Sequence, residues 1–388
     1  MRWMLPDGVE EWLPPDSWRL DAMRREVLDT FARHGFELVL PPVLEYTDSL
    51  HSGVGRDLEL RTFAVTDQTN GRRLGLRADI TPQAARIDAN RYADDARGVR
   101  RLCYLGTVLR THPEVPGGPR SLRQLGAEIF GAPQLDADIE VISLMCEILL
   151  RSGNGGGGAE LTLDLGHVGI VRALLPADLR EADSEGLRAA IQRKAPGEIR
   201  AQAQNLGLEA SAQEALVELA TWHGPPEHLE GLRPQAPPAC AAAIDELLEL
   251  SRRLRERLPR VAQHLDCGEL TGFHYHTGVT WAAYRDGRGQ ALARGGRYDG
   301  IGRVFGAARP ATGFSADLNG LLPESEAPAG PAEVVQAPCG DEAALLAVIR
   351  ELRNAGRRVL QRMPDEDFTP GPRLCRQGDD WIITDSTS

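Results

Sequence analysis

The stretch from Arg101 to Gly131, RLCYLGTVLRTHPEVPGGPRSLRQLGAEIFG, decides the fold of this 388-residue chain. Two strand-like runs, at residues 100–110 and 123–131, flank THPEVPGGP, a connection rich in proline and glycine. Consecutive strands joined by a short connection can pair side by side in antiparallel fashion. We therefore expect these two strands to be neighbours in an antiparallel sheet.

Hairpin patterns outside this stretch supply further strands. RTFAVTDQTNGRRLGLR (61–77) reads as two strands around Asn70-Gly71, and residues 278–285 and 290–296 read as another hairpin around Asp286-Gly287. FELVLPPVLEY (36–46) predicts a strand leading into a Pro-Pro turn, and AELTLDLG (159–166) predicts one more.

Helical segments are grouped before and between these strands. Pro15-Asp16-Ser17 can cap a helix that ends at Gly35, Thr81 can cap a second with Pro82 in its first turn, and residues 138–151 have helical periodicity. Hairpin-joined strands with grouped helices indicate an α+β fold built on an antiparallel sheet. A doubly wound nucleotide fold is excluded, because the chain has neither a Walker loop nor GxGxxG after a strand.

Shifts in composition suggest the domain organisation. We expect a core over residues 1–322, interrupted at about 168–265 by a helical insert rich in Ala, Leu, Arg and Glu. A proline-rich linker follows at 323–335. Residues 336–388 read as strand, helix, strand and one more strand, DWIITD, which predicts a small α/β segment.

Composition and charge limit the class of protein. The chain carries 44 basic and 56 acidic residues, a net charge of -12, which opposes tight sequence-independent binding to a polyanion. It contains no apolar run long enough for a membrane span and no secretory signal at its start, so we expect a cytoplasmic protein. The six cysteines are scattered, which favours reduced thiols over disulfides or zinc.

A cluster of polar residues falls on the predicted sheet. Arg110 ends one strand, and Gln124 and Glu128 lie four residues apart on the next, hence on the same face. Three further residues could complete the cluster, namely Asp79, Tyr275 and Tyr298. Carboxylates, an amide and phenol rings suit a small zwitterionic ligand, and a surface network of salt bridges is an equal alternative.

Other chemistry has less support. His274 and His276 form an HxH pair, which on a strand would point both rings to one face, yet a third metal ligand is not evident. The chain has no GxSxG and no cysteine with an obvious histidine partner. We therefore expect no metal, no cofactor and no catalytic nucleophile.

Several motifs together resemble a known family. Residues 101–131 look like the second class-defining motif of class II aminoacyl-tRNA synthetases in its histidyl form, and LRADITPQAAR (76–86) is similar to that enzyme's histidine-binding segment. GGRYDG (295–300) and ATGFSADLNGLL (311–322) look like its later motifs. The motifs occur in the family's order and cover roughly residues 5 to 322, so the resemblance implies a class II synthetase-like fold.

The resemblance also implies an amino-acid pocket, which we call the histidine-like pocket. Asp79 replaces a glutamate that takes the substrate ammonium, and Arg110 matches an arginine that holds the α-phosphate of ATP. His276 follows a matching tyrosine in the pocket wall. The other matching positions are Thr81, Gln124, Glu128, Tyr275 and Tyr298.

The groups that would handle ATP depart from the family pattern. His112 stands where the family has an acid that helps to seat adenine. Thr271 and Gly320 replace two arginines that act on the carboxylate and on the phosphates. Because adenylation depends on positioned cations, the resemblance implies that this reaction is lost and that the chain has no catalytic residues.

One branch of the family fits these departures, the regulatory subunits of ATP phosphoribosyltransferase. HYHTG (274–278), in place of the synthetase's LDYYN, is similar to that branch. The resemblance then implies a homodimer within a hetero-oligomer with the short catalytic subunit, and feedback control of the first step of histidine biosynthesis by L-histidine. The short acidic tail makes tRNA an unexpected partner.

Two other functions stay open on the sequence alone. One is an active but divergent histidyl-tRNA synthetase, which Thr271, Gly320 and the short tail oppose. The other is an amino-acid-binding or tRNA-binding module that serves a different partner. Whether histidine would occupy the histidine-like pocket or a subunit interface is likewise open.

Overall fold

The computed structural model describes residues 3–50, 56–92, 98–152, 161–176, 179, 181–270, 272–273, 275–287, 289–306, 308–322 and 333–386. Thr271, His274 and most of the expected linker lie outside these described residues. The chain divides into two compact units. The first comprises Met1–Glu10 and Met23–Pro323, and the second comprises Glu11–Ala22 and Glu324–Ser388.

A nine-stranded sheet forms the centre of the first unit, in the order β1-β5-β6-β12-β11-β10-β7-β9-β8. Its strands are β1 (Glu37–Leu38), β5 (Arg100–Leu109), β6 (Ser121–Phe130), β7 (Leu161–His167), β8 (His223–Gly224), β9 (Val261–Asp266), β10 (Val279–Arg285), β11 (Ala293–Arg297) and β12 (Ala311–Asp317). The pairs β1–β5 and β7–β9 are parallel, and all the other pairs are antiparallel. The predicted α+β fold with an antiparallel sheet flanked by helices is confirmed.

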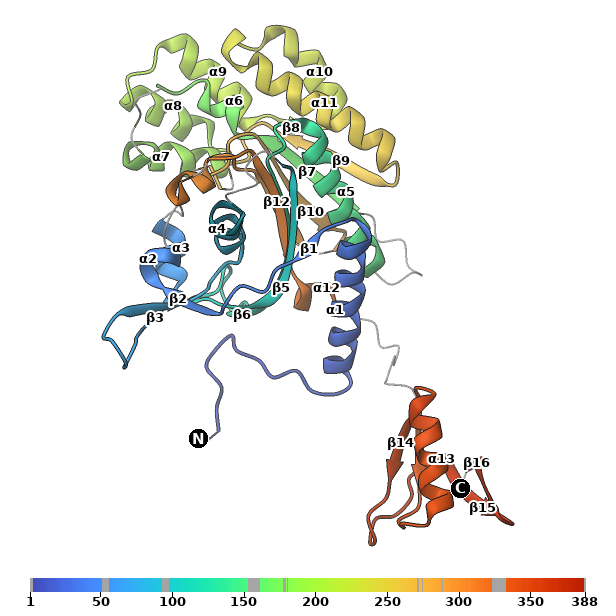
Figure 1. The fold of residues 1–388 in the computed structure, drawn as a ribbon. Helices are drawn as coiled ribbons and strands as arrows, with labels where there is room; N and C mark the ends of the chain where they lie inside the picture. The colour runs from blue at the N-terminus through green and yellow to red at the C-terminus, as the bar shows by residue number, and fades with distance from the viewer. Residues whose placement is uncertain are drawn as a thin grey trace. The chain divides into compact units, whose positions relative to one another are not determined.

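The strands β5 and β6, which the opening stretch predicts, pair along their whole length from Arg100↔Phe130 to Leu109↔Ser121. Two helices cover opposite faces of the sheet near these strands (Figure 1). One is α4 (Thr81–Arg91), and the other is α5 (Leu135–Ser152), whose Ile142, Met145 and Leu149 are almost wholly buried. The sheet face under α4 carries the candidate site.

A three-stranded sheet, in the order β2-β4-β3, lies in the same unit. It consists of β2 (Leu44–Tyr46), β3 (Phe63–Thr66) and β4 (Arg73–Leu76), with the short helices α2 (Thr47–Leu50) and α3 (Arg56–Arg61) between the first two strands. The β3–β4 pair is the predicted hairpin around Asn70-Gly71, and Gly71 has φ +73°. The strand predicted before the Pro-Pro turn of residues 36–46 is present as the short β1, and the residues after the turn form β2, which belongs to a different sheet.

The region expected to be a helical insert, at about residues 168–265, contains a series of helices and also contributes β8 and β9 to the main sheet. The helices are α6 (Val168–Arg172), α7 (Glu181–Gln192), α8 (Pro196–Asn205), α9 (Ala210–Thr221), α10 (Pro226–Leu232), η2 (Arg233–Gln235), η3 (Pro238–Cys240) and α11 (Ala241–Arg257). Apolar side chains of α6 to α9 form their own buried cluster, which includes Leu187, Ile199 and Leu216.

The helix α1 (Asp16–Arg33) begins at the predicted cap and ends just before Gly35, whose φ is +75°. The prediction that Thr81 caps α4 is wrong, because Thr81 is the first helical residue. The N-cap is Ile80, whose side chain cannot cap, and Asp79 before it accepts through Oδ1 a hydrogen bond of 2.9 Å from the Thr81 backbone N–H. The hydroxyl of Thr81 is thereby available to the site.

The second unit contains a four-stranded sheet in the order β14-β13-β15-β16, covered by one helix. The elements are β13 (Val334–Ala337), α13 (Ala343–Asn354), β14 (Arg358–Gln361), β15 (Gly371–Gln377) and β16 (Asp380–Ser386). The predicted strand, helix, strand and final strand are present, but β15 was not predicted. Its sequence, GPRLCRQ, has only one large aliphatic side chain, Leu374, on its buried face.

Across the described residues, no helix combines the length and the apolar character that crossing a bilayer requires. In the same ranges, no three His, Cys, Asp or Glu side chains are grouped as metal ligands would be.

Candidate functional site

Two glycines leave room for side chains over the sheet face that carries Glu128. Residues paired across strands point to the same face, and the register places one row of residues there, Glu128, Gly313, Gly296, Thr280 and Gly166. A Cβ on Gly313 would lie 1.4 Å from Oε2 of Glu128, and one on Gly296 would lie 2.7 Å from Nε2 of His276. The two glycines therefore provide the room that the side chains of the site occupy.

The buried carboxyl of Glu128 is the centre of this site. Only 1% of Glu128 is exposed, and its Oε1 accepts a 2.9 Å hydrogen bond from the hydroxyl of Tyr104. The hydroxyl of Tyr298 donates to Oε2. Thr81 Oγ1 lies 2.9 Å from the Tyr104 oxygen and, since that hydroxyl donates to Glu128, Thr81 donates to it.

A second carboxyl, that of Asp79, joins the same network. Gln124 Nε2 donates to Asp79 Oδ1 at 2.8 Å, and Gln124 Oε1 accepts from the Ile80 N–H at 2.8 Å. The Asp79 oxygen also accepts the Thr81 N–H. The network thus runs without a break from Gln124 to Glu128.

Aromatic rings stand beside these carboxyls. The ring of His276 lies 4.3 Å from that of Tyr275 and 6.4 Å from that of Tyr298, measured between centroids. His276 is buried, whereas Tyr275 is 44% exposed. Arg172 Nη2 donates to the carbonyl of His276 at 3.1 Å. A wall of three rings therefore closes one side of the site.

The expected strand arrangement of the HxH pair is wrong for His276. The strand β10 begins only at Val279, and His276 lies in the preceding loop, where its N–H donates to the carbonyl of Gly272. His274 is outside the described residues. The position of His276 suits a pocket wall.

Arg110 lies at the edge of the group, at the end of β5. Its Nε is 3.5 Å from the carbonyl oxygen of Ala78, next to Asp79, and its Nη1 pairs with Glu114 at 2.9 Å. The structure therefore brings together the polar and ring side chains of the histidine-like pocket and places Arg110 beside them, held by Glu114. Their part in binding a ligand stays a prediction.

The sequence reasoning missed Tyr104. This residue is wholly buried and links Thr81 to Glu128 by its hydroxyl. Gly126 of β6 pairs with Tyr104 of β5, and a Cβ on this glycine would lie 2.4 Å from the Tyr104 oxygen. The alternation of side chains along a strand was the available signal. Tyr104 and Arg110 are an even number of residues apart in the predicted strand, so their side chains are expected on the same face.

Burial controls the protonation of the site. Removal of the carboxyl from water raises the pKa of Glu128 to about 8, and the hydrogen bonds from Tyr298 and Tyr104 counteract only part of that rise. Burial, followed by the negative charge of Glu128, also raises the pKa of Tyr298. At neutral pH, below this pKa, Glu128 is therefore mainly the neutral acid.

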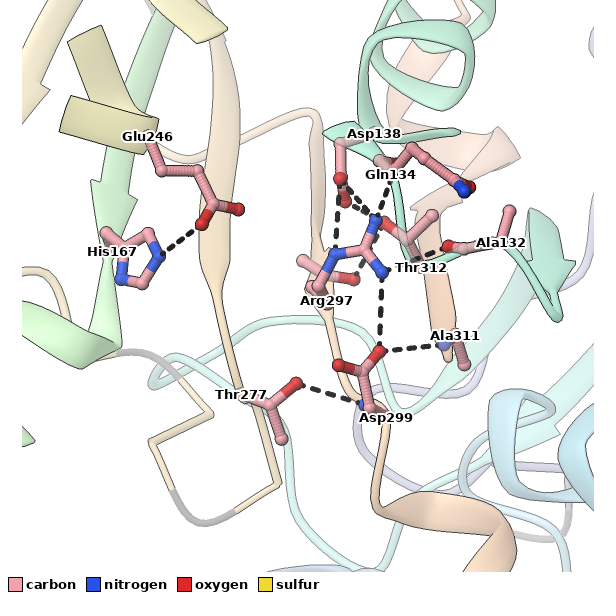
Figure 2. Close-up of polar contacts among 11 residues, drawn as sticks. Ala132, Gln134, Asp138, His167, Glu246, Thr277, Arg297, Asp299, Ala311 and Thr312 are labelled. Carbon is pink, nitrogen blue, oxygen red and sulfur yellow. Dashed lines mark hydrogen bonds and ion pairs between the residues drawn. The ribbon is translucent and has the colours of Figure 1, made fainter. Parts of the chain in front are cut away.

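A buried ion pair lies behind this face of the sheet, where Asp138 of α5 meets Arg297 of β11 (Figure 2). Asp138 is fully buried and Arg297 is 5% exposed. Arg297 Nη2 lies 2.5 Å from Asp138 Oδ2, and Thr312 donates to Asp138 Oδ1 at 2.6 Å. The carbonyls of Ala132 and Gln134 accept two further guanidinium hydrogen bonds.

The same network fixes the residues on either side of Tyr298. Asp299 Oδ1 accepts from the Ala311 N–H at 2.9 Å, and the Asp299 N–H donates to Thr277 Oγ1 at 3.1 Å (Figure 2). The Thr277 N–H donates in turn to the carbonyl of Arg297. The loop with Tyr275 and His276 and the turn with Tyr298 are thus tied to one buried charge pair.

Comparison with known proteins identifies the family. Residues 8–321 match the family Histidyl-tRNA synthetase, and residues 332–384 match the ATP phosphoribosyltransferase subunit HisZ C-terminal domain. A relative from Thioalkalivibrio sulfidiphilus, named ATP phosphoribosyltransferase regulatory subunit, is 48% identical and aligns over 99% of this chain and 98% of its own length. The chain belongs to the family of ATP phosphoribosyltransferase regulatory subunits. The resemblance inferred from the sequence is confirmed.

Solved structures place this regulatory-subunit family on the synthetase fold. An ATP phosphoribosyltransferase regulatory subunit/histidyl-tRNA synthetase from Bacillus halodurans is 26% identical, with a TM-score of 0.78 over 93% of each chain. A chain of the ATP phosphoribosyl transferase (HisG:HisZ) complex from Thermotoga maritima, 18% identical, has a TM-score of 0.58 and covers 79% of this chain and 98% of its own. The latter likeness shows the fold alone.

The positions that would handle ATP in a synthetase differ in this regulatory-subunit chain. A Cβ on Gly320 of α12 (Leu318–Leu321) would meet nothing within 4 Å, so space does not explain the absence of an arginine there. His112 lies in the exposed loop after β5, with its Nδ1 3.0 Å from Thr111 Oγ1. Thr271 lies outside the described residues. The missing cations agree with a subunit that does not adenylate.

Proposed function

We propose that this chain is the non-catalytic regulatory subunit of ATP phosphoribosyltransferase. With a short catalytic subunit it supports the first step of L-histidine biosynthesis and makes that step sensitive to L-histidine. The observation that carries the proposal is the match to regulatory subunits over nearly the whole chain, including the HisZ C-terminal domain. A divergent active synthetase is not favoured. A cytoplasmic location is part of this proposal.

The catalytic partner is supported by a structural neighbour. The chain from Thermotoga maritima that shares this fold comes from a HisG:HisZ complex. We extend that pairing to this chain, with HisG in the role of the short catalytic subunit.

The histidine-like pocket is the proposed effector site. The carboxylates of Asp79 and Glu128 would take the ammonium of L-histidine, and the amide of Gln124 its carboxylate. The rings of Tyr275, His276 and Tyr298 would line the pocket around it. Feedback control further requires that histidine bind one state of the complex better than the other.

A homodimer is supported by the segment that contains β1. β1 is an edge strand of the nine-stranded sheet, and an edge leaves backbone groups ready to pair. Around it, Leu38, Leu40, Val43 and Leu44 are exposed apolar side chains on one short segment. Such a concentration is typical of a protein interface, and we assign it to a second copy of this chain.

The affinity for L-histidine should rise with pH between 7 and 8 and level off above about 8. Because its pKa is raised, Glu128 must lose a proton before it can pair with an ammonium. The affinity for L-histidine therefore falls by up to about tenfold for each pH unit below about 8. Calorimetry in two buffers of different ionisation enthalpy should show proton release at pH 7. A Glu128→Gln variant should bind weakly at every pH, and wild-type affinity that is equal at pH 7 and 8.5 would refute this linkage.

The purified chain should show no histidine-dependent exchange between ATP and pyrophosphate. Loss of one positioned donor typically costs about 100-fold or more in rate, and two arginines are replaced here. An authentic histidyl-tRNA synthetase at the same concentration serves as the positive control. Exchange at a comparable rate would instead establish the divergent synthetase.

A further inference from the structure

A polar cavity lies in the first unit, apart from the residues of the histidine-like pocket. Its volume is about 340 Å³, within the range of small-ligand sites. The side chains come from β7, β9, β10 and the turn after β10. The lining residues are Thr162, Asp164, His264, Tyr284, Arg285, Asp286 and Gly287.

The strand register places this cavity on the same sheet face as Glu128. One row of paired residues runs across the sheet from Gly126 through Ser315, Arg294, Ala282 and Asp164 to His264. Gly126 lies two residues before Glu128, hence on the same face. The cavity lies at the β9 end of this row, and β12 and β11 lie between its strands and β6, which carries Glu128.

The imidazole of His264 is held in a fixed orientation. Its Nδ1 lies 2.8 Å from Asp164 Oδ1, and its Nε2 lies 3.2 Å from Nδ1 of His223. The three side chains come from adjacent strands, β7, β9 and β8. A carboxylate, an imidazole and a second imidazole therefore form a preorganised polar chain at the cavity.

The charged lining of the cavity consists of two carboxyls, those of Asp164 and Asp286, and one guanidinium, that of Arg285. Burial raises the pKa of Asp164, the hydrogen bond and charge of His264 lower it, and the acids Asp266 and Glu269 raise it further; Asp266 is itself paired with Lys194. Arg285 donates from Nη2 to the carbonyl of Leu149 at 2.6 Å, on the helix that covers the other face of the sheet.

Another cation, Arg294, lies close enough to Tyr284 to lower the pKa of its phenol, against the larger raising effect of burial. The ring of Tyr284 lines the cavity, and aromatic rings attract cations. The hydroxyl of Thr162 and the carboxyls of Asp164 and Asp286 add acceptors. Acceptors with an aromatic wall favour a positively charged ligand.

We propose that this cavity binds a small organic cation, an ammonium or imidazolium compound, independently of the histidine-like pocket. Asp164, fixed through His264, takes the charge, and Tyr284 supports it. A metal ion does not fit the donor set, because the described residues contain no cluster of three metal-ligating side chains. The proposal is separate from the regulatory function and does not depend on it.

The test is titration of the full-length chain with histamine, a cation that carries both an ammonium and an imidazole. Binding should be at least tenfold weaker in Asp164→Asn, and should stay unchanged in Glu214→Ala, an exposed position on the helical insert outside the cavity. Asp286→Asn, in the turn outside the strands, should also weaken binding and avoids a folding defect in the sheet. Acetate, an anion, should not bind in this cavity.

Two results would overturn the proposal. One is wild-type protein that does not bind histamine. The other is binding that disappears in Glu128→Gln and persists in both Asp164→Asn and Asp286→Asn, which would assign histamine to the histidine-like pocket.

Discussion

Replacement of Asp138 with alanine is expected to lower the free energy of unfolding of the first unit by about 3–5 kcal/mol. The substitution leaves the buried guanidinium of Arg297 with only a 3.4 Å contact to the carboxylate of Asp299, and Thr312 loses its 2.6 Å hydrogen bond to Asp138. Coulombic attraction between two buried groups compensates for their desolvation only while both are present. Urea denaturation of wild type and variant measures the difference.

The matched control is Asp136→Ala, on the same helix. Asp136 also pairs with an arginine, Arg253, at 2.6 Å, but its side chain is 71% exposed, so its loss should change stability little. The double variant Asp138→Ala/Arg297→Met should recover part of the loss, because it removes the unpaired charge. Equal stability of Asp138→Ala and Asp136→Ala would contradict this account of the buried pair.

Replacement of Glu128 with alanine is expected to weaken L-histidine binding by about 100-fold, if the histidine-like pocket is the effector site. Truncation of one partner of a buried, hydrogen-bonded charge pair costs about 2–5 kcal/mol. The hydroxyls of Tyr104 and Tyr298 also lose their acceptor. Tyr298→Ala should weaken binding as well, because it removes a donor and one ring of the wall. Isothermal titration provides both affinities.

A Glu214→Ala variant is the control for this experiment. Glu214 pairs with Arg200 on exposed helices of the insert, away from the sheet, so the affinity for histidine should stay at the wild-type value. Unchanged affinity in both Glu128→Ala and Tyr298→Ala would move the regulatory site to a subunit interface. The buried network would then be a structural feature inherited from the synthetase fold.

Local patterns were enough to predict the sheet and the central residues of the candidate site. Period-two alternation placed Gln124 and Glu128 on one face, and the structure connects both to a single network through Asp79 and Tyr104. The hairpin at Asn70-Gly71 was predictable because its turn needs a positive φ, which glycine adopts readily. Alternation and turn chemistry act over a few residues, so the sequence displays them directly.

Features that depend on tertiary contacts were not predictable. The chain separates Asp138 from Arg297 by 159 positions, and only the packing of α5 on β11 brings them together. The N-cap of α4 is Ile80 and not Thr81, and the Thr81 N–H is bound by Asp79, which Gln124 holds from a distant strand. The loop conformation of His276 likewise follows from contacts with Arg172.

The most direct test of the regulatory function is reconstitution of the full-length chain with the short catalytic subunit. The account predicts that the two proteins co-elute in size-exclusion chromatography. It also predicts that phosphoribosyl transfer to ATP increases in the mixture, and that L-histidine inhibits the mixture more strongly than the catalytic subunit alone. Separate elution, with activity and histidine sensitivity equal to those of the catalytic subunit alone, would contradict it.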